Sequence, residues 1–398
     1  MPNYLAPGFM KEFCCVAEAC DDNCCHGWRV DIDKDTYQAY RQCRDPELGG
    51  ELRAKTARAG DTADGGRYAK ILMTEEGNCP FLSGEGLCRI QRKLGEGMLS
   101  RTCRRYPRVV HSIGGVLEMT AQLSCPAVAR AALLPPEPMA FSVMASDRDC
   151  PPNAVFAPPE QPDKPGHYFA ELRAFGISVL QNRVYTVPER LVLLGMFLRQ
   201  LPENGALIPS LISAANKQYG KAEETKEQLG IIQAVPGLQI QLLKLIVDHK
   251  KKASSLKYQD IYRRALLGLG YTGASDGQIL NNYLSGIERY VKPFFSGHGH
   301  MIEHVLVHEY FLMMMPFGAF PSAWDAYVYL VMLYGMIKFI MAGVAREQGR
   351  LDAQTVLSIV QSLTREILHN EQLILQIIRI LHENELDTPA YMTILALH

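Results

Sequence analysis

The sequence predicts a mainly α-helical protein in which a small cysteine-rich domain of mixed structure precedes a larger all-α domain. Three observations support this prediction: cysteines crowd the first third of the chain, nine prolines lie between Pro135 and Pro165, and helical periodicity begins near His167. The 398 residues suffice for two or three domains. We therefore expect a cysteine-rich metal-binding domain over 1–134, a proline-rich linker over 135–165, and an all-α domain for substrate or partner binding over 166–398.

The cysteines of the first domain have the spacing of a metal site. Five of them lie within twelve residues, from Cys14 to Cys25, and Cys79, Cys88 and Cys103 follow singly. Packing alone does not require such crowding, because a buried cysteine behaves as a small hydrophobic residue. Soft thiolates at short spacings select zinc or an iron–sulfur cluster. One compact block plus scattered cysteines, with no histidine at zinc-finger spacing, favours an iron–sulfur centre, with zinc as the alternative.

The predicted metal ligands outnumber what one cluster needs. They are Cys15, Cys20, Cys24, Cys25, Cys79, Cys88 and Cys103. A four-iron cluster takes four protein ligands, so the remaining thiols are either buried partners or part of a second small site. Cys125, within the sequence LSCP, is a lesser candidate, and we interpret Cys150 as a bystander.

Basic residues gather around Cys88 and Cys103. The segment has one acidic residue, Glu96, and seven basic ones: Arg89, Arg92, Lys93, Arg101, Arg104, Arg105 and Arg108. Such charge would favour thiolates and offset an anionic cluster, or it forms a solvated basic face. The net charge of the whole chain is only −1, which argues against a nucleic-acid binder.

Local signals predict the elements of the first domain. The segment from Trp28 to Asp33 alternates like a short strand, or like an extended lead into a helix at Asp35. Residues 108–113 and 116–123 flank Gly114-Gly115, and a Gly-Gly pair suits the two-residue turn of a β-hairpin. Because this domain has little regular structure per cysteine, bound metal would supply stability that a small core cannot.

From His167 onward the sequence predicts helices joined by short turns. The residues from Thr186 to Glu189 have the form of a capping box at the start of a helix that runs to Leu201. Further helices are expected near 207–219, 222–234, 237–251, 256–268, 276–292, 299–315, 323–347, 353–369 and 371–384. We expect a packed irregular bundle, since no repeat of fixed period is evident. The apolar stretch 327–345 contains one charge, Lys338, and we interpret it as a buried central helix and not as a membrane span.

Two motifs of cofactor or metal enzymes are incomplete. Residues Gly268 to Gly273 spell G-x-G-x-x-G, but a helical stretch precedes them where a dinucleotide site needs a strand, so we interpret them as a helix end. His300, His304 and His308 share one helical face without the internal glutamate of H-E-x-x-H, which favours polar packing or substrate contact over a zinc site. The sequence has neither a nucleophile elbow nor a P-loop, which argues against hydrolase and kinase sites.

The cysteine blocks resemble the flagellin lysine-N-methylase (FliB) family. The resemblance rests on CVAEACDDNCCHGWRVDID at 15–33 and on the later CPFL, GLCRIQ, LSRTCRRYP and LSCPAVAR, which follow in the same order. The chain is similar, more distantly, to cysteine-cluster proteins with a C-x2-C-x2-CC signature that chelate zinc or iron. The resemblance implies an enzyme that uses S-adenosylmethionine to methylate lysine side chains of flagellin and carries a cysteine-ligated metal centre.

Two hypotheses from different classes follow. The first is this methyltransferase; the second is a non-catalytic metal-binding adaptor whose helical domain binds a protein partner. The radical S-adenosylmethionine motif C-x3-C-x2-C fails by one cysteine, because Gly27 stands where the third would be. Lysine must lose a proton before it can attack a methyl group, and Tyr106 is the candidate proton acceptor nearest the cysteine motif in sequence.

The N-terminus lacks the layout of a signal peptide, so we expect a cytoplasmic protein with reduced thiols.

Overall fold

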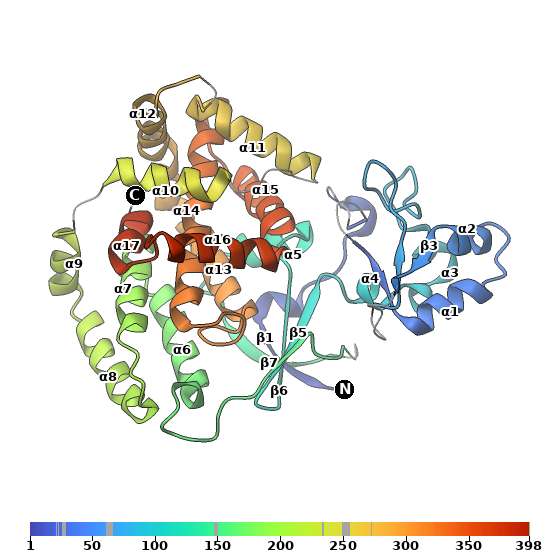
Figure 1. The fold of residues 1–398 in the computed structure, drawn as a ribbon, viewed down its shortest axis with the longest axis horizontal. Helices are drawn as coiled ribbons and strands as arrows, with labels where there is room; N and C mark the ends of the chain where they lie inside the picture. Colours follow the sequence, from blue (N-terminus) through green and yellow to red (C-terminus); the bar gives the residue numbers. More distant parts are fainter. Residues whose placement is uncertain are drawn as a thin grey trace.

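In the computed structural model, a large helical body fills one side of the molecule and a smaller part with short strands projects from it (Figure 1). The structure describes residues 1–20, 22, 24–25, 29–60, 67–146, 150–232, 235–248, 255–271 and 273–397. Its strands form a five-stranded sheet of order β7-β1-β6-β5-β8 and a three-stranded sheet of order β2-β4-β3. Predictions that involve Gly27, Trp28 or Thr272 lie outside the described residues.

Both sheets lie in the first part of the chain, together with five short α-helices. The strands are β1 (Asn3–Pro7), β2 (Asp31–Ile32), β3 (Thr56–Arg58), β4 (Ala69–Ile71), β5 (Arg108–Ile113), β6 (Val116–Ala121), β7 (Phe141–Ala145) and β8 (Ala154–Phe156). The helices are α1 (Lys34–Gln42), α2 (Leu48–Ala54), α3 (Arg89–Leu94), α4 (Arg101–Arg105) and α5 (Pro126–Leu133). The mixed character predicted for this region is confirmed.

The five-stranded sheet is built on the predicted hairpin. Strands β5 and β6 pair antiparallel, and Gly114 and Gly115 between them both have positive φ, as the turn requires. Strand β1 pairs parallel with β6 and antiparallel with β7, and β8 pairs parallel with β5. The stretch predicted as a proline-rich linker, 135–165, therefore supplies two strands of this sheet; its prolines flank the strands, where a missing N–H does no harm.

The described residues after Pro165 contain helices and no strand, as predicted for this region. The α-helices are α6 (Phe169–Leu180), α7 (Val187–Arg199), α8 (Ile208–Tyr219), α9 (Ala222–Gly230), α10 (Pro236–Asp248), α11 (Leu256–Leu269), α12 (Asp276–Gly286), α13 (Lys292–Leu312), α14 (Ala323–Gln348), α15 (Ala353–Leu363), α16 (Glu371–Glu383) and α17 (Pro389–Leu397). Two π-helical turns, η7 (Ile287–Val291) and η8 (Thr364–Leu368), join α12 to α13 and extend α15.

Local sequence patterns predicted where several of these helices begin or end. The capping box of α7 is confirmed, because the Thr186 backbone N–H donates to Glu189 at 2.6 Å. Gly270 ends α11 in the left-handed conformation, which confirms that the G-x-G-x-x-G residues mark a helix end. Helix α13 begins at Lys292, not near 299, because the chain continues helically through Gly297 and Gly299 with a kink at His298.

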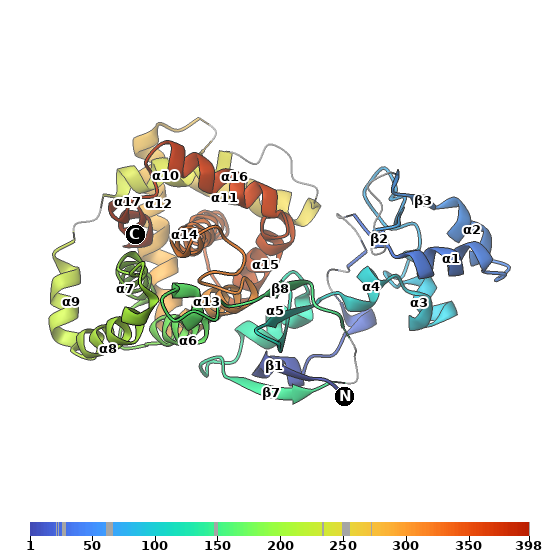
Figure 2. The same cartoon turned by 60° about the horizontal axis from the view of Figure 1, so that its bottom comes forward.

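Helix α14 is the centre of the large hydrophobic core. It contacts α7, α10, α11, α12, α13, α15 and α17, and Figure 2 shows it nearly end-on among them. It is long and apolar enough to cross a membrane, yet its most apolar window is fully buried within the protein, in agreement with the predicted central helix. Strand residues such as Val110 and Met119 belong to the same core, so the five-stranded sheet is part of the helical body.

A second, smaller core lies in the projecting part. Ile32, Tyr40, Leu52, Phe81 and Ile90 are among its buried residues, which come from the three-stranded sheet, the first helices and the loops between them. We call the described residues from Cys24 to Arg105, with α1–α4 and β2–β4, the small domain. The two cores thus divide the chain differently from the predicted domains, since β1, the hairpin and α5 pack with the later helices.

Lys338 is the one charged residue in the buried part of α14, and it makes stability depend on pH. Its Nζ lies 4.8 Å from the centre of the Tyr334 ring. Burial, with a smaller effect from Lys292, lowers the pKa of Lys338 from 10.5 to about 7. Between these values the unfolded chain binds more protons than the folded one, so the free energy of unfolding rises with pH.

We expect Lys338→Met to remove this dependence. From pH 7 to pH 9 the wild type should gain about 2 kcal/mol of unfolding free energy relative to the variant, as measured by urea denaturation at both pH values. Parallel pH dependences in the two proteins would mean that the folded state keeps Lys338 charged.

Candidate active site beside a cysteine group

Five cysteines from four segments meet in the small domain. Cys79 is buried in the small core. Cys25, Cys88 and Cys103 are partly buried and pack against this core. The backbone N–H of Cys79 donates to the carbonyl oxygen of Cys25 at 2.7 Å, which ties two of the segments together. Cys88 is the residue before α3, Cys103 lies within α4, and Cys24 adjoins Cys25.

These thiols act on one another electrostatically. A side-chain hydrogen bond with Cys24 and then burial raise the pKa of Cys25, and negative charge on Cys79 or Cys88 raises it further. Burial raises the pKa of Cys79 to about 11 and that of Cys103 to about 12, and the charges of Cys24 and Cys88 add to both effects. Because the thiolate is the metal-binding form, several thiolates can exist here together only beside a compensating cation.

The other two predicted ligands belong to a second group. Burial raises the pKa of Cys125 to about 11, and the charges of Cys20 and Cys15 raise it further, which places these three residues near one another. Sγ of Cys20 lies 3.4 Å from the carbonyl oxygen of Asp22. The seven predicted ligands therefore divide into a first group of Cys24, Cys25, Cys79, Cys88 and Cys103 and a second group of Cys15 and Cys20 with Cys125.

The chemistry of the first group suits a soft metal or an iron–sulfur cluster. The five thiols gathered here, of the eleven cysteines in the chain, exceed the four that one cluster takes. In the part of the chain that the structure describes, no three His, Cys, Asp or Glu side chains are already arranged around a metal position. The thiols would therefore turn toward a common centre on binding.

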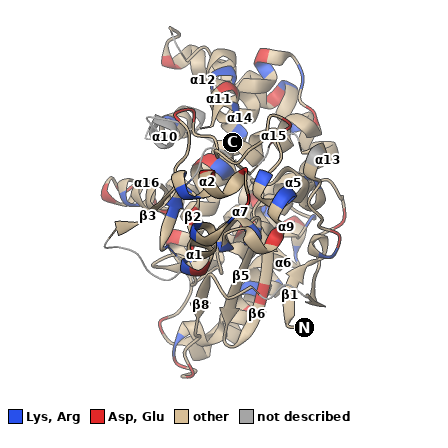
Figure 3. Cartoon of the chain, turned by 90° about the vertical axis from the view of Figure 1, so that its right-hand side faces the viewer, with Lys and Arg blue, Asp and Glu red and all other residues tan. Residues whose placement is uncertain are grey.

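Five of the seven basic residues around Cys88 and Cys103 form two sets. Arg89 makes two hydrogen bonds with Glu51, and Lys93 lies 2.6 Å from Glu47. These pairs lie on the small domain, where basic and acidic residues are interspersed (Figure 3). The other set, Arg101, Arg105 and Arg108, lines a cavity of about 610 Å³.

Helix α4 joins the cysteine group to this cavity. Cys103 belongs to the first thiol group, whereas Arg101, Thr102 and Arg105 of the same short helix line the cavity. Ser100 caps the helix by accepting a hydrogen bond from the Cys103 N–H at 3.2 Å. Any ligand in the cavity would thus lie one helix away from a metal held by Cys103.

Arg105 lines the cavity and has one buried donor without a partner in the part of the chain that the structure describes. Its Nη2 donates to the carbonyl oxygen of Pro151 and to Oδ1 of Asn153, both at 2.6 Å. Its Nε is buried and has no hydrogen-bond partner among the described residues. A buried donor without an acceptor is costly, and a carboxylate from a ligand would satisfy it.

A second cavity, of about 390 Å³, adjoins the first. Both are lined by Val109, Gln122, Asn153 and His369, and we call the two together the cleft. The cleft lies between α4 of the small domain, strand β5 and the C-terminal helices. Its far wall contains Glu309 near the end of α13.

Glu309 is held by two neighbouring side chains. The Tyr329 hydroxyl donates to Oε2 at 2.8 Å, and Nδ1 of His308 lies 3.3 Å from Oε1. Nε2 of His308 donates to the carbonyl oxygen of Ala121 at 2.8 Å, because a carbonyl can only accept. His369 is exposed and lines both cavities of the cleft.

The histidine face predicted on α13 lies in the core. Nδ1 of His304 lies 2.8 Å from the carbonyl oxygen of Ala132, and His308 contacts the sheet, as expected for polar packing. Burial lowers the pKa of His300 and of His304, so both favour the neutral form. Sequence reasoning missed Glu309, although an acidic residue within the apolar run VLVHEYFLMMM was a visible signal.

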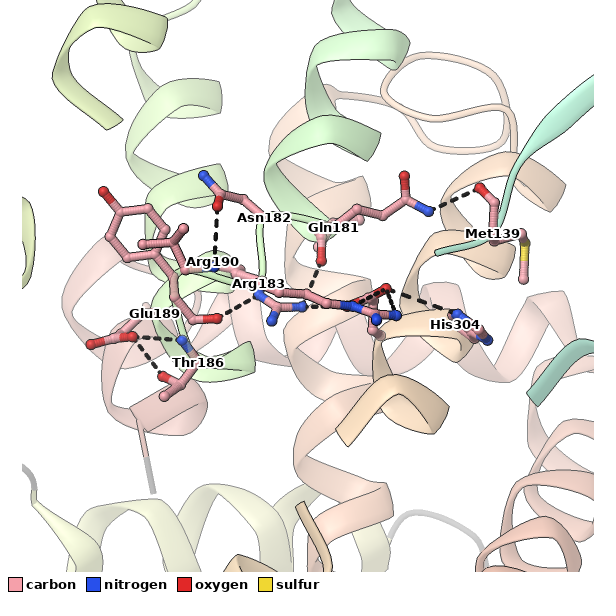
Figure 4. Close-up of polar contacts among 12 residues, drawn as sticks. Met139, Gln181, Asn182, Arg183, Thr186, Glu189, Arg190 and His304 are labelled. Atoms are coloured by element: carbon pink, nitrogen blue, oxygen red, sulfur yellow. Dashed lines mark hydrogen bonds and ion pairs between the residues drawn. The ribbon is translucent and has the colours of Figure 1, made fainter. Parts of the chain in front are cut away.

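A third cavity, of about 950 Å³, is lined by Arg183, Arg190 and Glu303. The Arg183 and Arg190 guanidinium groups converge in Figure 4, and both bind Glu303, at 2.9 and 2.7 Å. The carboxylate of Glu303 is therefore already paired with two arginines. This arrangement holds α7 and the loop before it to α13, which is a structural role.

Asp22 connects the cysteine-rich segment to the C-terminal helices. Oδ1 of Asp22 lies 2.7 Å from Arg365 and Oδ2 accepts from Gln361 at 2.6 Å, with the Asp22 and Arg365 side chains only 8% and 7% exposed. Lys257 lies 3.8 Å away. Because Asp22 stands between Cys20 and Cys24, this ion pair positions the backbone of both cysteine groups.

Comparisons with known proteins give one consistent result. Residues 173–395 match the family model described as FliB lysine N-methylase C-terminal domain. The chain is 24% identical over 385 residues to proteins named Lysine-N-methylase from Salmonella choleraesuis (strain SC-B67) and Salmonella typhimurium (strain LT2), and each alignment covers 92% of both chains. It is 33% identical over 136 residues to a protein of Salmonella muenchen named Flagellar biosynthetic protein FliU, which covers 34% of this chain and 79% of that protein. No solved structure matches the chain.

Proposed function

The chain belongs to the FliB lysine N-methylase family, and on that premise we propose that it transfers methyl groups from S-adenosylmethionine to lysine side chains of flagellin. Family membership makes the chain a lysine N-methyltransferase. The flagellar name of the third relative supports flagellin as the protein substrate. The alternative of a non-catalytic metal-binding adaptor does not fit membership of an enzyme family.

The proposal includes a four-iron cluster held by four thiols of the first cysteine group, with zinc as the alternative metal. The support is the number of cysteines in this group and their mutual electrostatic influence. Such a centre, when bound, would supply redox or Lewis-acid chemistry beside the cleft. We also propose a cytoplasmic location, because a reducing compartment keeps these thiols available.

The position of α4 between thiols and cleft is the observation that supports this function best. S-adenosylmethionine carries a carboxylate, and the guanidinium groups of Arg101 and Arg105 line the cavity next to Cys103. The unpartnered Nε of Arg105 would donate to that carboxylate. The methyl donor would then lie in the cleft, with room in the adjoining cavity for a lysine side chain.

We expect anaerobically purified protein to transfer label from methyl-tritiated S-adenosylmethionine to flagellin of the organism that encodes the chain. Acid hydrolysis of the product should place the label on N-methyllysine. Flagellin whose lysines have been acetylated is the matched control and should remain unlabelled. Failure of metal-loaded enzyme to label intact flagellin, while the two proteins still copurify, would favour the adaptor.

A further inference from the structure

The target lysine of a methyltransferase must lose a proton before it reacts. A lysine ammonium group has a pKa of about 10.4 in water and no lone pair while protonated. An acceptor at the site must therefore receive the proton, and a buried carboxylate also attracts the cation. This requirement directs attention to the acidic side chains that line the cleft.

Glu309 differs from Glu118 and Glu303, two other buried glutamates of the core. Glu118 pairs with Arg173 and Glu303 with Arg183 and Arg190, so their charges are compensated. No lysine or arginine forms an ion pair with Glu309 among the described residues, although its side chain is only 1% exposed. His308 is cationic only when protonated, so a ligand cation in the cavity would add a permanent cationic partner for this buried carboxylate.

The cavity in front of Glu309 suits an alkylammonium side chain. Leu312, Met313, Phe320 and Leu368 contribute apolar surface to its wall, and Glu309 is the buried acid that lines it. Four methylene groups of a lysine would pack against such a wall while its ammonium met the carboxylate. The flexible methionine side chain adapts readily to mono- and dimethylated forms of the same group.

We propose that this cavity is the lysine-acceptor site and that Glu309 is the catalytic base, an inference that rests on the proposed function. One ammonium proton moves from lysine Nζ to a Glu309 oxygen, where Nδ1 of His308 can share it. The freed Nζ lone pair forms the bond to the methyl carbon of S-adenosylmethionine. The bond between that carbon and sulfur breaks, and its electron pair remains on sulfur to give S-adenosylhomocysteine. Tyr329 is a positioning residue that holds the carboxylate through Oε2.

The test compares Glu309→Gln with the wild type in the flagellin-labelling assay. We expect kcat to fall by about 100- to 10,000-fold, the usual contribution of a general base, with metal content and circular dichroism unchanged. The residual rate should rise about tenfold per pH unit between pH 7 and 9, because only lysine already deprotonated in solution can react. The titratable groups around the carboxylate are His308, Tyr329, His369, His111 and Glu371, and all remain in this variant.

Two further variants keep the test decisive. Glu224→Gln removes an exposed glutamate on α9, whose side chain is 65% exposed, and should keep the wild-type rate and pH profile. If Glu309→Gln fails to fold, Tyr329→Phe serves instead: it removes the hydrogen bond that positions the carboxylate, so kcat should fall while KM for flagellin keeps its wild-type value. A wild-type rate and profile in a folded Glu309→Gln protein would overturn this assignment while the proposed function stood, whereas an inactive wild type would overturn the proposed function itself.

Discussion

Cys88→Ser should remove most of the bound iron and abolish flagellin methylation, while the protein keeps its helical content. Cys88 belongs to the first thiol group, where its charge acts on Cys25, Cys79 and Cys103. A serine hydroxyl is a hard, weakly acidic donor and does not replace a thiolate on iron. The large helical core does not include Cys88, so its fold should survive the loss of metal.

The comparison needs two companion variants. Cys43→Ser alters another partly buried cysteine of the small core and should retain iron, colour and activity, because Cys43 is not among the predicted ligands. Cys20→Ser alters the second group and should lose less iron than Cys88→Ser if one cluster lies in the first group. Anaerobic protein should be brown, and iron and labile sulfide can be quantified on each variant.

Three results would change this interpretation. Colourless wild-type protein with one zinc per chain would replace the cluster by a zinc site. Equal iron loss in Cys20→Ser and Cys88→Ser would mean that the two thiol groups contribute to one centre. Unchanged methylation by iron-free Cys88→Ser would make the centre purely structural.

Sequence reasoning succeeded where a structure is specified by neighbouring residues. The hairpin at 108–121 follows from Gly114-Gly115 between two alternating runs, and α7 begins at the capping box formed by Thr186 and Glu189. The fold also brings five of the seven predicted ligands together, and the metal site itself stays a prediction. These signals are local or compositional.

Pairings between distant segments could not be read from the sequence. Strand β1 lies between β6 and β7, and no local pattern in Asn3–Pro7 selects those partners. The proline-rich stretch was expected to be a linker because prolines disfavour regular structure. Strands β7 and β8 are short, however, so each fits into the sheet between the prolines. Asp22 and Arg365 are separated by 343 residues, so their ion pair becomes visible only in the fold.

That ion pair should be the most sensitive link between the cysteine-rich segment and the helical body. Both side chains are more than nine-tenths buried, and Asp22 also accepts a hydrogen bond from Gln361. Removing Arg365 takes a close cation away from a buried carboxylate; Lys257 lies 3.8 Å from it and is more exposed. Breaking a buried pair from one side typically costs about 3–5 kcal/mol.

We therefore expect Arg365→Met to lower the free energy of unfolding by about that amount in urea titrations and to release iron faster under mild chelation. Arg263→Met is the matched control: its pair with Asp260 is more than half exposed on both sides, and such surface pairs contribute at most about 1 kcal/mol. The double variant Asp22→Asn with Arg365→Met should be more stable than the sum of the single changes predicts, because it removes both buried charges together. Wild-type stability and iron retention in Arg365→Met would show that the cysteine-rich segment holds its position without this contact, and the metal centre would then be independent of the C-terminal helices.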